Sequence, residues 1–235
     1  MASSDALDVR NVTKVYGGRG KRGDAAKTIA LENVSMRVGA GEFVAIMGPS
    51  GSGKSTLLNC ISTIDVPTSG QIVIGGRNVE ALSRCEVAKF RRDELGFVFQ
   101  DSNLLDTLTA YENIALALTI KHTPAREVDM RVRELARILG ISEVLDKYPH
   151  QLSGGQKQRV AAARATVGNP TLVLADEPTG ALDSKSAKVL LETFSLLNQR
   201  GSTIVMVTHD SFTASCTNRV VFIKDGRFWG PSGAR

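Results

Sequence analysis

The 235-residue sequence contains no apolar run long enough to cross a membrane as a helix. Its uninterrupted apolar stretches, such as 114–118, fall far short of the roughly 18 residues that a spanning helix needs. Residues 1–10 also lack the apolar centre of a secretory signal. We therefore expect a chain that is made and kept in the cytosol, and that reaches a membrane by docking on a membrane protein.

Cysteine and histidine are scarce, with three of each. Cys60, Cys85 and Cys216 are too far apart for a CxxC pair, which favours reduced and mostly buried thiols over a metal or redox role. The histidines also lack the spacing of metal ligands. They are His122, His150 and His209.

The excess of positive charge in the chain is confined to one segment, residues 10–27. The chain has 29 basic and 24 acidic residues, a net charge of +5, and residues 10–27 account for all of it. A nucleic-acid-binding protein would spread its basic residues over a binding face, so we expect no nucleic-acid partner. The segment is typical of a solvated loop, and contact with lipid headgroups or a protein partner is the alternative.

The remaining composition is that of a globular protein, with 42% hydrophobic and 23% charged residues and no internal repeat. Apolar runs alternate with helical periodicity, which predicts an α/β fold with a mainly parallel sheet covered on both sides. Thr123 is expected to cap a helix that has Pro124 in its first turn, and Gly140 to end it. Strands are expected at 7–12, 31–38, 43–47, 71–74, 96–99, 171–175, 203–208 and 220–223, and helices at 54–62, 124–139, 154–164 and 185–198.

Residues 48–55 fit the phosphate-binding pattern GxxxxGK[ST], between an apolar strand and a helix. Glycines let successive backbone N–H groups approach a phosphate, and the helix N-terminus adds partial positive charge. Lys54 is expected to reach the β and γ phosphates, and the Ser55 hydroxyl to bind Mg²⁺. The predicted nucleotide-binding residues here are Gly48, Pro49, Ser50, Gly51, Ser52, Gly53, Lys54, Ser55 and Thr56.

An acidic pair follows a second apolar strand. Asp176 at the strand end is expected to hold Mg²⁺, and Glu177 to activate the attacking water. Taken alone, the pair also fits an acidic helix start before Pro178. With the phosphate loop in the same chain, the catalytic interpretation is favoured.

A second anion-binding pattern precedes another predicted helix. Ser153, Gly154, Gly155 and Gln156 would present N–H groups and a positive helix end. One nucleotide does not need two such loops from one subunit. We therefore expect this loop to complete the site of a second copy, in a head-to-tail dimer that encloses two ATP molecules.

These motifs, in this order, resemble the ATP-binding cassette family over essentially the whole chain. The resemblance implies that Tyr16 stacks on adenine and that Gln100 touches Mg²⁺ and links to a transmembrane partner. It also implies that Asp183 belongs to the loop after the acidic pair and that His209 contacts the γ-phosphate. The implied fold is a P-loop NTPase with an N-terminal antiparallel β subdomain. The single domain 1–235 would comprise a RecA-like core at about 1–103 and 168–235, and a helical subdomain at about 104–167.

Further stretches narrow the resemblance to the subgroup of lipoprotein-release, macrolide-export and cell-division ATPases. Within it, residues 97–109, 183–187, 207–210 and 222–226 look closest to bacitracin-type peptide-antibiotic resistance ATPases, although Ser102 replaces an aromatic residue common there. The implied partner is a separate permease with ten membrane spans, often linked to a sensor kinase. The implied location is the inner face of the cell membrane. The other subgroup functions and a soluble, non-transport cassette ATPase are the alternatives.

Overall fold

The computed structural model describes residues 5–17 and 27–229. The basic loop predicted for 18–27 lies outside the described residues, apart from Lys27. Within the described ranges, no helix is both long and apolar enough to cross a bilayer.

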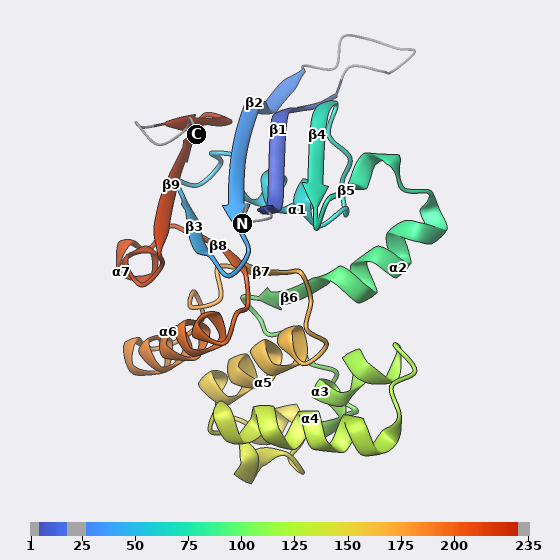
Figure 1. Cartoon of the computed structure of the whole chain (residues 1–235). Helices are drawn as coiled ribbons and strands as arrows, with labels where there is room; N and C mark the ends of the chain where they lie inside the picture. Colours follow the sequence, from blue (N-terminus) through green and yellow to red (C-terminus); the bar gives the residue numbers. More distant parts are fainter. Residues whose placement is uncertain (1–4, 18–26, 230–235) are drawn as a thin grey trace.

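Two sheets form the upper part of the molecule in Figure 1. The smaller sheet is antiparallel and the larger is parallel except for its last strand, as expected. In spatial order the smaller sheet holds β2 (Thr28–Gly39), β1 (Asp5–Tyr16), β4 (Ser69–Ile74) and β5 (Arg77–Asn78), and the larger holds β10 (Arg227–Trp229), β9 (Arg219–Lys224), β3 (Phe43–Met47), β8 (Ile204–Thr208), β7 (Leu172–Asp176) and β6 (Leu95–Phe99).

The central strands are buried on both faces, because their side chains alternate between two cores. In β7, Leu172 and Leu174 pack into the core shared with the antiparallel sheet. Val173 and Ala175 pack into the opposite core, which contains the helices. This alternation explains why these strands read as continuous apolar runs in the sequence.

The helices lie mostly on the second face of the parallel sheet (Figure 1). There α5 packs against β6, α6 and α3, while α4 covers α3 and α5 on the outside. The helices are α1 (Lys54–Ile61), α2 (Arg84–Glu94), α3 (Ala110–Thr119), α4 (Ala125–Ile138), α5 (Gly154–Thr166), α6 (Ser184–Gln199) and α7 (Ser211–Ser215), with short 3₁₀ turns at Val79–Ala81, Ser142–Val144 and Pro149–Gln151.

The ends of α4 show one confirmed and one wrong prediction. Gly140 ends the helix with φ of 60°, and the Ile141 N–H donates to the Ala136 carbonyl at 2.9 Å, a Schellman closure. Thr123 is not the N-cap. Pro124 takes that position because its ψ of 139° keeps it outside the helix.

The cysteines differ from the expectation that they are mostly buried. The thiols are free, but only Cys60 is buried, whereas Cys85 is exposed on α2 and Cys216 is half-buried.

Helix α2 itself has no apolar periodicity and buries only Phe90, so hydrophobic spacing did not predict it. Its sequence signal is the capping box that Ser83 forms with Glu86. The boundaries of the helical subdomain stay a prediction.

Candidate active site at the sheet edge

Four adjacent strands bring the predicted catalytic residues to one edge of the parallel sheet. Strands β3, β8, β7 and β6 are neighbours that end within one residue of each other. Met47 pairs with Thr208, whereas Asp176 pairs with Phe99 on one side and, on the other, with Val207, one residue before the end of β8. Because carboxyl ends of parallel strands share an edge, the next residues of each chain segment meet there. These segments carry Lys54, His209, Glu177 and Gln100.

The phosphate loop requires glycine at two positions for steric reasons. A Cβ on Gly48 would lie 2.1 Å from the Ile223 carbonyl oxygen. Gly53 has φ of 102°, and a Cβ there would lie 2.5 Å from the Ala30 oxygen. Such distances exclude side chains, so the loop can curl closely between β3 and α1.

Lys54 is the first residue of α1 and is buried within the loop. Its ammonium Nζ donates to the carbonyl oxygens of Gly48 at 2.7 Å and Pro49 at 2.9 Å. The buried Ser52 hydroxyl has no hydrogen-bond partner among the described residues. The Lys54 ammonium and the Ser52 hydroxyl can each donate a hydrogen bond to a phosphate oxygen instead, because phosphate oxygens are strong acceptors.

The second residue of the acidic pair, Glu177, directly follows β7 and faces His209. The His209 Nδ1 lies 2.8 Å from the Glu177 carboxylate. Glu177 has φ of 46°, a left-handed conformation that is uncommon outside glycine and asparagine. Burial and the neighbouring Glu177 charge raise the pKa of Asp176, against the opposing effect of Lys54. The pair thus concentrates negative charge next to the phosphate loop.

Gln100 lies at the end of β6 and its backbone is held by α5. The Gln158 amide Nε2 donates to the carbonyl oxygens of Phe99, at 2.9 Å, and of Gln100. Gly180 leaves room for the Gln100 side chain, because a Cβ there would lie 3.2 Å from the Gln100 amide carbon. Gln158 is a positioning residue that the sequence reasoning did not single out.

These residues surround one pocket of about 700 Å³. One wall of the pocket is formed by Thr28, Ile29 and Ala30 of β2. The sequence analysis did not predict these residues, because they belong to no chemical motif. The predicted residues that line the pocket are Pro49, Ser50, Gly51, Gly53, Lys54, Ser55, Thr56, Gln100, Glu177 and His209.

Tyr16 lies at the rim of this pocket without lining it. Its strand partner is Thr28, which does line the pocket. The phenol hydroxyl donates to Asp65 at 2.7 Å, and the side chain is 41% exposed. The hydroxyl of the ring is therefore fixed beside the strand that forms one wall of the pocket.

Residues 153–156 and Asp183 lie together, but they do not line the pocket. Ser153 caps α5 by accepting from the Gln156 N–H at 3.2 Å, and the Gln156 side chain accepts from the Ser153 N–H at 2.9 Å. Asp183 caps α6 and accepts from the Ser186 hydroxyl at 2.6 Å, which lowers its pKa. A Cβ on Gly155 would lie 3.2 Å from Ser186, so the two helix starts adjoin. Gly154 stands on the same helix start, beside Leu182.

The oxygen donors near the phosphate loop fit Mg²⁺. Magnesium is usually bound through one or two carboxylates together with substrate phosphates, not through a protein cage. Asp176 supplies a carboxylate whose ionised form is destabilised by its surroundings, Ser55 a hydroxyl and Gln100 an amide oxygen. No cluster of three histidine, cysteine or acidic side chains suited to a metal occurs within the described residues.

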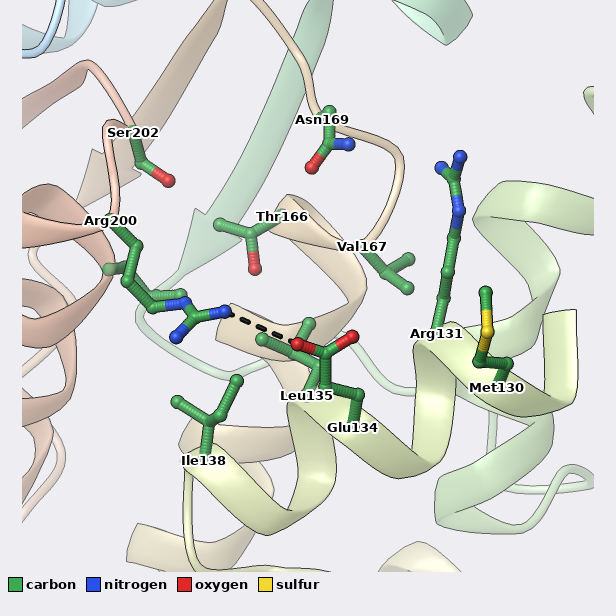
Figure 2. A pocket seen from close by; sticks show the side chains of 11 residues that line it. Met130, Arg131, Glu134, Leu135, Ile138, Thr166, Val167, Asn169, Arg200 and Ser202 are labelled. Carbon is green, nitrogen blue, oxygen red and sulfur yellow. Dashed lines mark hydrogen bonds and ion pairs between the residues drawn. The ribbon is translucent and has the colours of Figure 1, made fainter. Parts of the chain in front are cut away.

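A second pocket, of about 350 Å³, lies between α4 and the carboxyl ends of α5 and α6. Figure 2 shows Glu134 on α4 directed toward Arg200, with an N–O distance of 3.3 Å. None of the predicted site residues lines this pocket.

A glycine-rich loop between β3 and α1, at the carboxyl edge of a parallel sheet, defines a P-loop nucleotide-binding protein. The family model described as "ABC transporter" matches residues 31–180. The chain belongs to this family, and it is an ATP-binding, ATP-hydrolysing subunit of an ABC transporter.

Known proteins resemble the chain over nearly its whole length. It is 51% identical to the uncharacterized ABC transporter ATP-binding protein YvcR of Bacillus subtilis, over 96% of this chain and 86% of that protein. It is 50% identical to the bacitracin export ATP-binding protein BceA of Halalkalibacterium halodurans, over 95% and 87%. A dimeric structure of the cassette MJ0796, from Methanocaldococcus jannaschii, bound to ADP and Pi, is 42% identical with a TM-score of 0.82, over 95% and 97%.

Proposed function

We propose that two copies of this chain close head to tail around two ATP molecules, each pocket completed by residues 153–156 of the other copy. The observation that carries this proposal is the separation of the two anion-binding segments. The phosphate loop lines the 700 Å³ pocket, whereas the start of α5 adjoins Ser186 in its own chain. The dimeric ADP- and Pi-bound form of a 42% identical cassette supports the arrangement.

In the proposed site, positioning and charge neutralisation dominate catalysis. Lys54 would give up its two carbonyl acceptors for phosphate oxygens, and Glu177 would take a proton from the attacking water. His209, 2.8 Å from Glu177, would orient that carboxylate and contact the γ-phosphate. Tyr16 would stack on adenine. Mg²⁺, held by Asp176, Ser55 and Gln100, would neutralise charge on the phosphates.

The proposed biological role is to power a separate membrane permease, from the cytosolic face, in resistance to bacitracin-type peptide antibiotics. The 50% identity to a bacitracin export ATPase over 95% of the chain supports this role. A sensor kinase acting through the permease is part of the proposal.

Substitution of Ser153 by arginine tests the composite site. Ser153→Arg puts a bulky charge where the partner's nucleotide would lie, so ATP hydrolysis should be lost while one copy still binds ATP. Ser83→Arg is the matched control, because Ser83 forms the same kind of capping box on α2. Loss of ATP binding by the Ser153→Arg monomer, measured by calorimetry, would show that this loop serves its own subunit.

Recovery of the membrane partner tests the biological role. We would extract a tagged Glu177→Gln variant from host membranes with ATP, and measure bacitracin resistance in cells that carry either the wild type or the variant. A ten-span permease and resistance that requires Glu177 are expected. A four-span permease without a resistance effect would indicate lipoprotein release, macrolide-type export or cell division. The absence of any membrane partner would contradict the transport role.

A further inference from the structure

The Tyr16 side chain belongs to a three-residue cluster at the end of β1. The Asp65 carboxylate accepts from the Tyr16 hydroxyl at 2.7 Å through one oxygen and from the Lys14 ammonium at 2.5 Å through the other. The Lys14 nitrogen also lies 4.9 Å from the centre of the Tyr16 ring, within cation–π range. The ring is therefore held at its hydroxyl and on one face.

The segment that carries Asp65 is itself attached to both neighbouring elements. The Asp65 N–H donates to the Asn59 carbonyl of α1 at 3.1 Å. The Lys14 ammonium donates to the Val66 carbonyl at 2.8 Å, and the Val66 N–H donates back to Asp65 at 2.8 Å. The Thr68 N–H bonds to the Thr13 carbonyl at 2.8 Å. The cluster thus links the end of β1 to the helix that begins at the phosphate loop.

Burial and charge show that the cluster constrains the ring. The side chains of Lys14 and Asp65 are only 11% and 29% exposed, whereas Tyr16 keeps 41% exposure at the pocket rim. Burial and the bond to Asp65 both raise the pKa of Tyr16, so the phenol stays a donor. A fixed ring loses less conformational freedom when a flat base stacks on it.

We propose that Lys14 and Asp65 are positioning residues for the nucleotide base, holding the Tyr16 ring at the angle at which a purine stacks on it. The proposal rests on the adenine-binding role given to Tyr16 above. It predicts that Lys14 and Asp65 affect the affinity for the base and not for the triphosphate.

The test compares ATP with inorganic tripolyphosphate, both with Mg²⁺, by calorimetry on the full chain. Asp65→Ala and Lys14→Met should weaken ATP binding by roughly 2- to 10-fold, the range of one aromatic stacking contact, and leave tripolyphosphate binding unchanged. Adding Asp65→Ala to Tyr16→Ala should cause no further loss, because Asp65 acts through the ring.

The chain contains a matched control in the helices. Asp129 accepts from the Tyr111 hydroxyl at 3.3 Å and from Arg133 at 2.8 Å, and Arg133 lies over the Tyr111 ring. Asp129→Ala therefore removes the same type of cluster away from the pocket, and it should leave ATP affinity unchanged.

Three results would overturn the inference. Equal weakening of ATP and tripolyphosphate by Asp65→Ala would indicate a general structural role. Unchanged ATP affinity in Asp65→Ala and Lys14→Met, together with weaker binding by Tyr16→Ala, would reject the positioning role alone. Unchanged affinity in Tyr16→Ala would reject the adenine role itself. Circular dichroism on each variant checks that the fold is retained.

Discussion

The surroundings of Asp176 destabilise its ionised carboxylate in the nucleotide-free protein. Burial first, and then the Glu177 charge, raise its pKa above the ordinary value of about 3.9. For a carboxyl group whose pKa is higher in the folded than in the unfolded state, the stabilisation is present below the unfolded value. It is lost as the pH rises through the folded value. At neutral pH, ionised Asp176 therefore weakens the nucleotide-free fold.

Removing this charge should separate stability from function. Asp176→Asn is expected to raise the melting temperature of the nucleotide-free protein at pH 7, to give no gain near pH 4, and to abolish ATP hydrolysis. Thermal unfolding across this pH range measures the effect. Asp210 gives the control of opposite sign, because its bond from the Thr213 hydroxyl lowers its pKa. Asp210→Asn should lower the melting temperature at pH 7. A loss of stability in Asp176→Asn at pH 7 would contradict the account.

The cysteines differ in their expected reactivity. Burial raises the pKa of the Cys60 thiol to about 11, which leaves almost no thiolate at neutral pH. Cys85 is exposed on α2. Brief treatment with iodoacetamide at pH 7.5 should modify Cys85 and leave Cys60 intact, as peptide mass spectrometry would report. Rapid labelling of Cys60 in the folded protein would show that α1 opens readily.

At the scale of elements, α5 joins two functional segments. Residues 153–156 form its N-cap and first turn, and farther along, Gln158 and Arg164 donate to backbone carbonyls of residues 99–103. Burial lowers the pKa of Arg164. Because a helix is stiff, a shift at its start would move the carbonyls bound to its side chains. In the proposed dimer, α5 would thus couple the loop that faces the other copy's nucleotide to the Gln100 loop of its own pocket.

Gln158→Leu should remove one of these attachments. Its amide is buried and bonded to two carbonyls, so the variant should lose about 1–3 kcal/mol of unfolding free energy. Amide exchange should speed up at residues 99–103. Urea unfolding and hydrogen–deuterium exchange measure the two effects, with the exposed Gln199→Leu as control. Unchanged exchange at 99–103 would mean that other contacts hold the loop.

The elements that could be predicted from the sequence are those with a regular hydrophobic pattern or a local chemical motif. The buried strands β3 and β7 and the phosphate loop were recognisable because burial on both faces produces apolar runs, and phosphate contact demands glycine. Helix α2 escaped hydrophobic analysis because it buries only Phe90. The clusters around Asp65 and Gln158 depend on contacts between segments remote in sequence, 49 residues apart for Tyr16 and Asp65. No local pattern encodes such contacts.

At the scale of the whole molecule, the proposed dimer predicts a nucleotide-dependent change of mass. The 25.2 kDa chain should run as a monomer without nucleotide. Glu177→Gln with ATP should run as a dimer, because hydrolysis that would reopen the interface is slowed by roughly 10²- to 10⁴-fold. Light scattering after size exclusion measures this. Ser153→Arg added to Glu177→Gln should restore the monomer, and a persistent dimer would place the interface elsewhere.

The shared carboxyl edge of the parallel sheet restricts how this chain can change in length. The last residues of β3, β6, β7 and β8 lie within one residue of each other in the strand register, so the groups that follow them start at nearly the same height. One residue inserted into any of these strands would displace the following group by about 3.3 Å and turn its side chain to the other face. Turns at the opposite edge, such as 200–203, lack this constraint. Insertions and deletions among relatives should therefore accumulate at the edge of the sheet remote from the phosphate loop. The lengths of these four strands should vary among relatives as little as the catalytic side chains do.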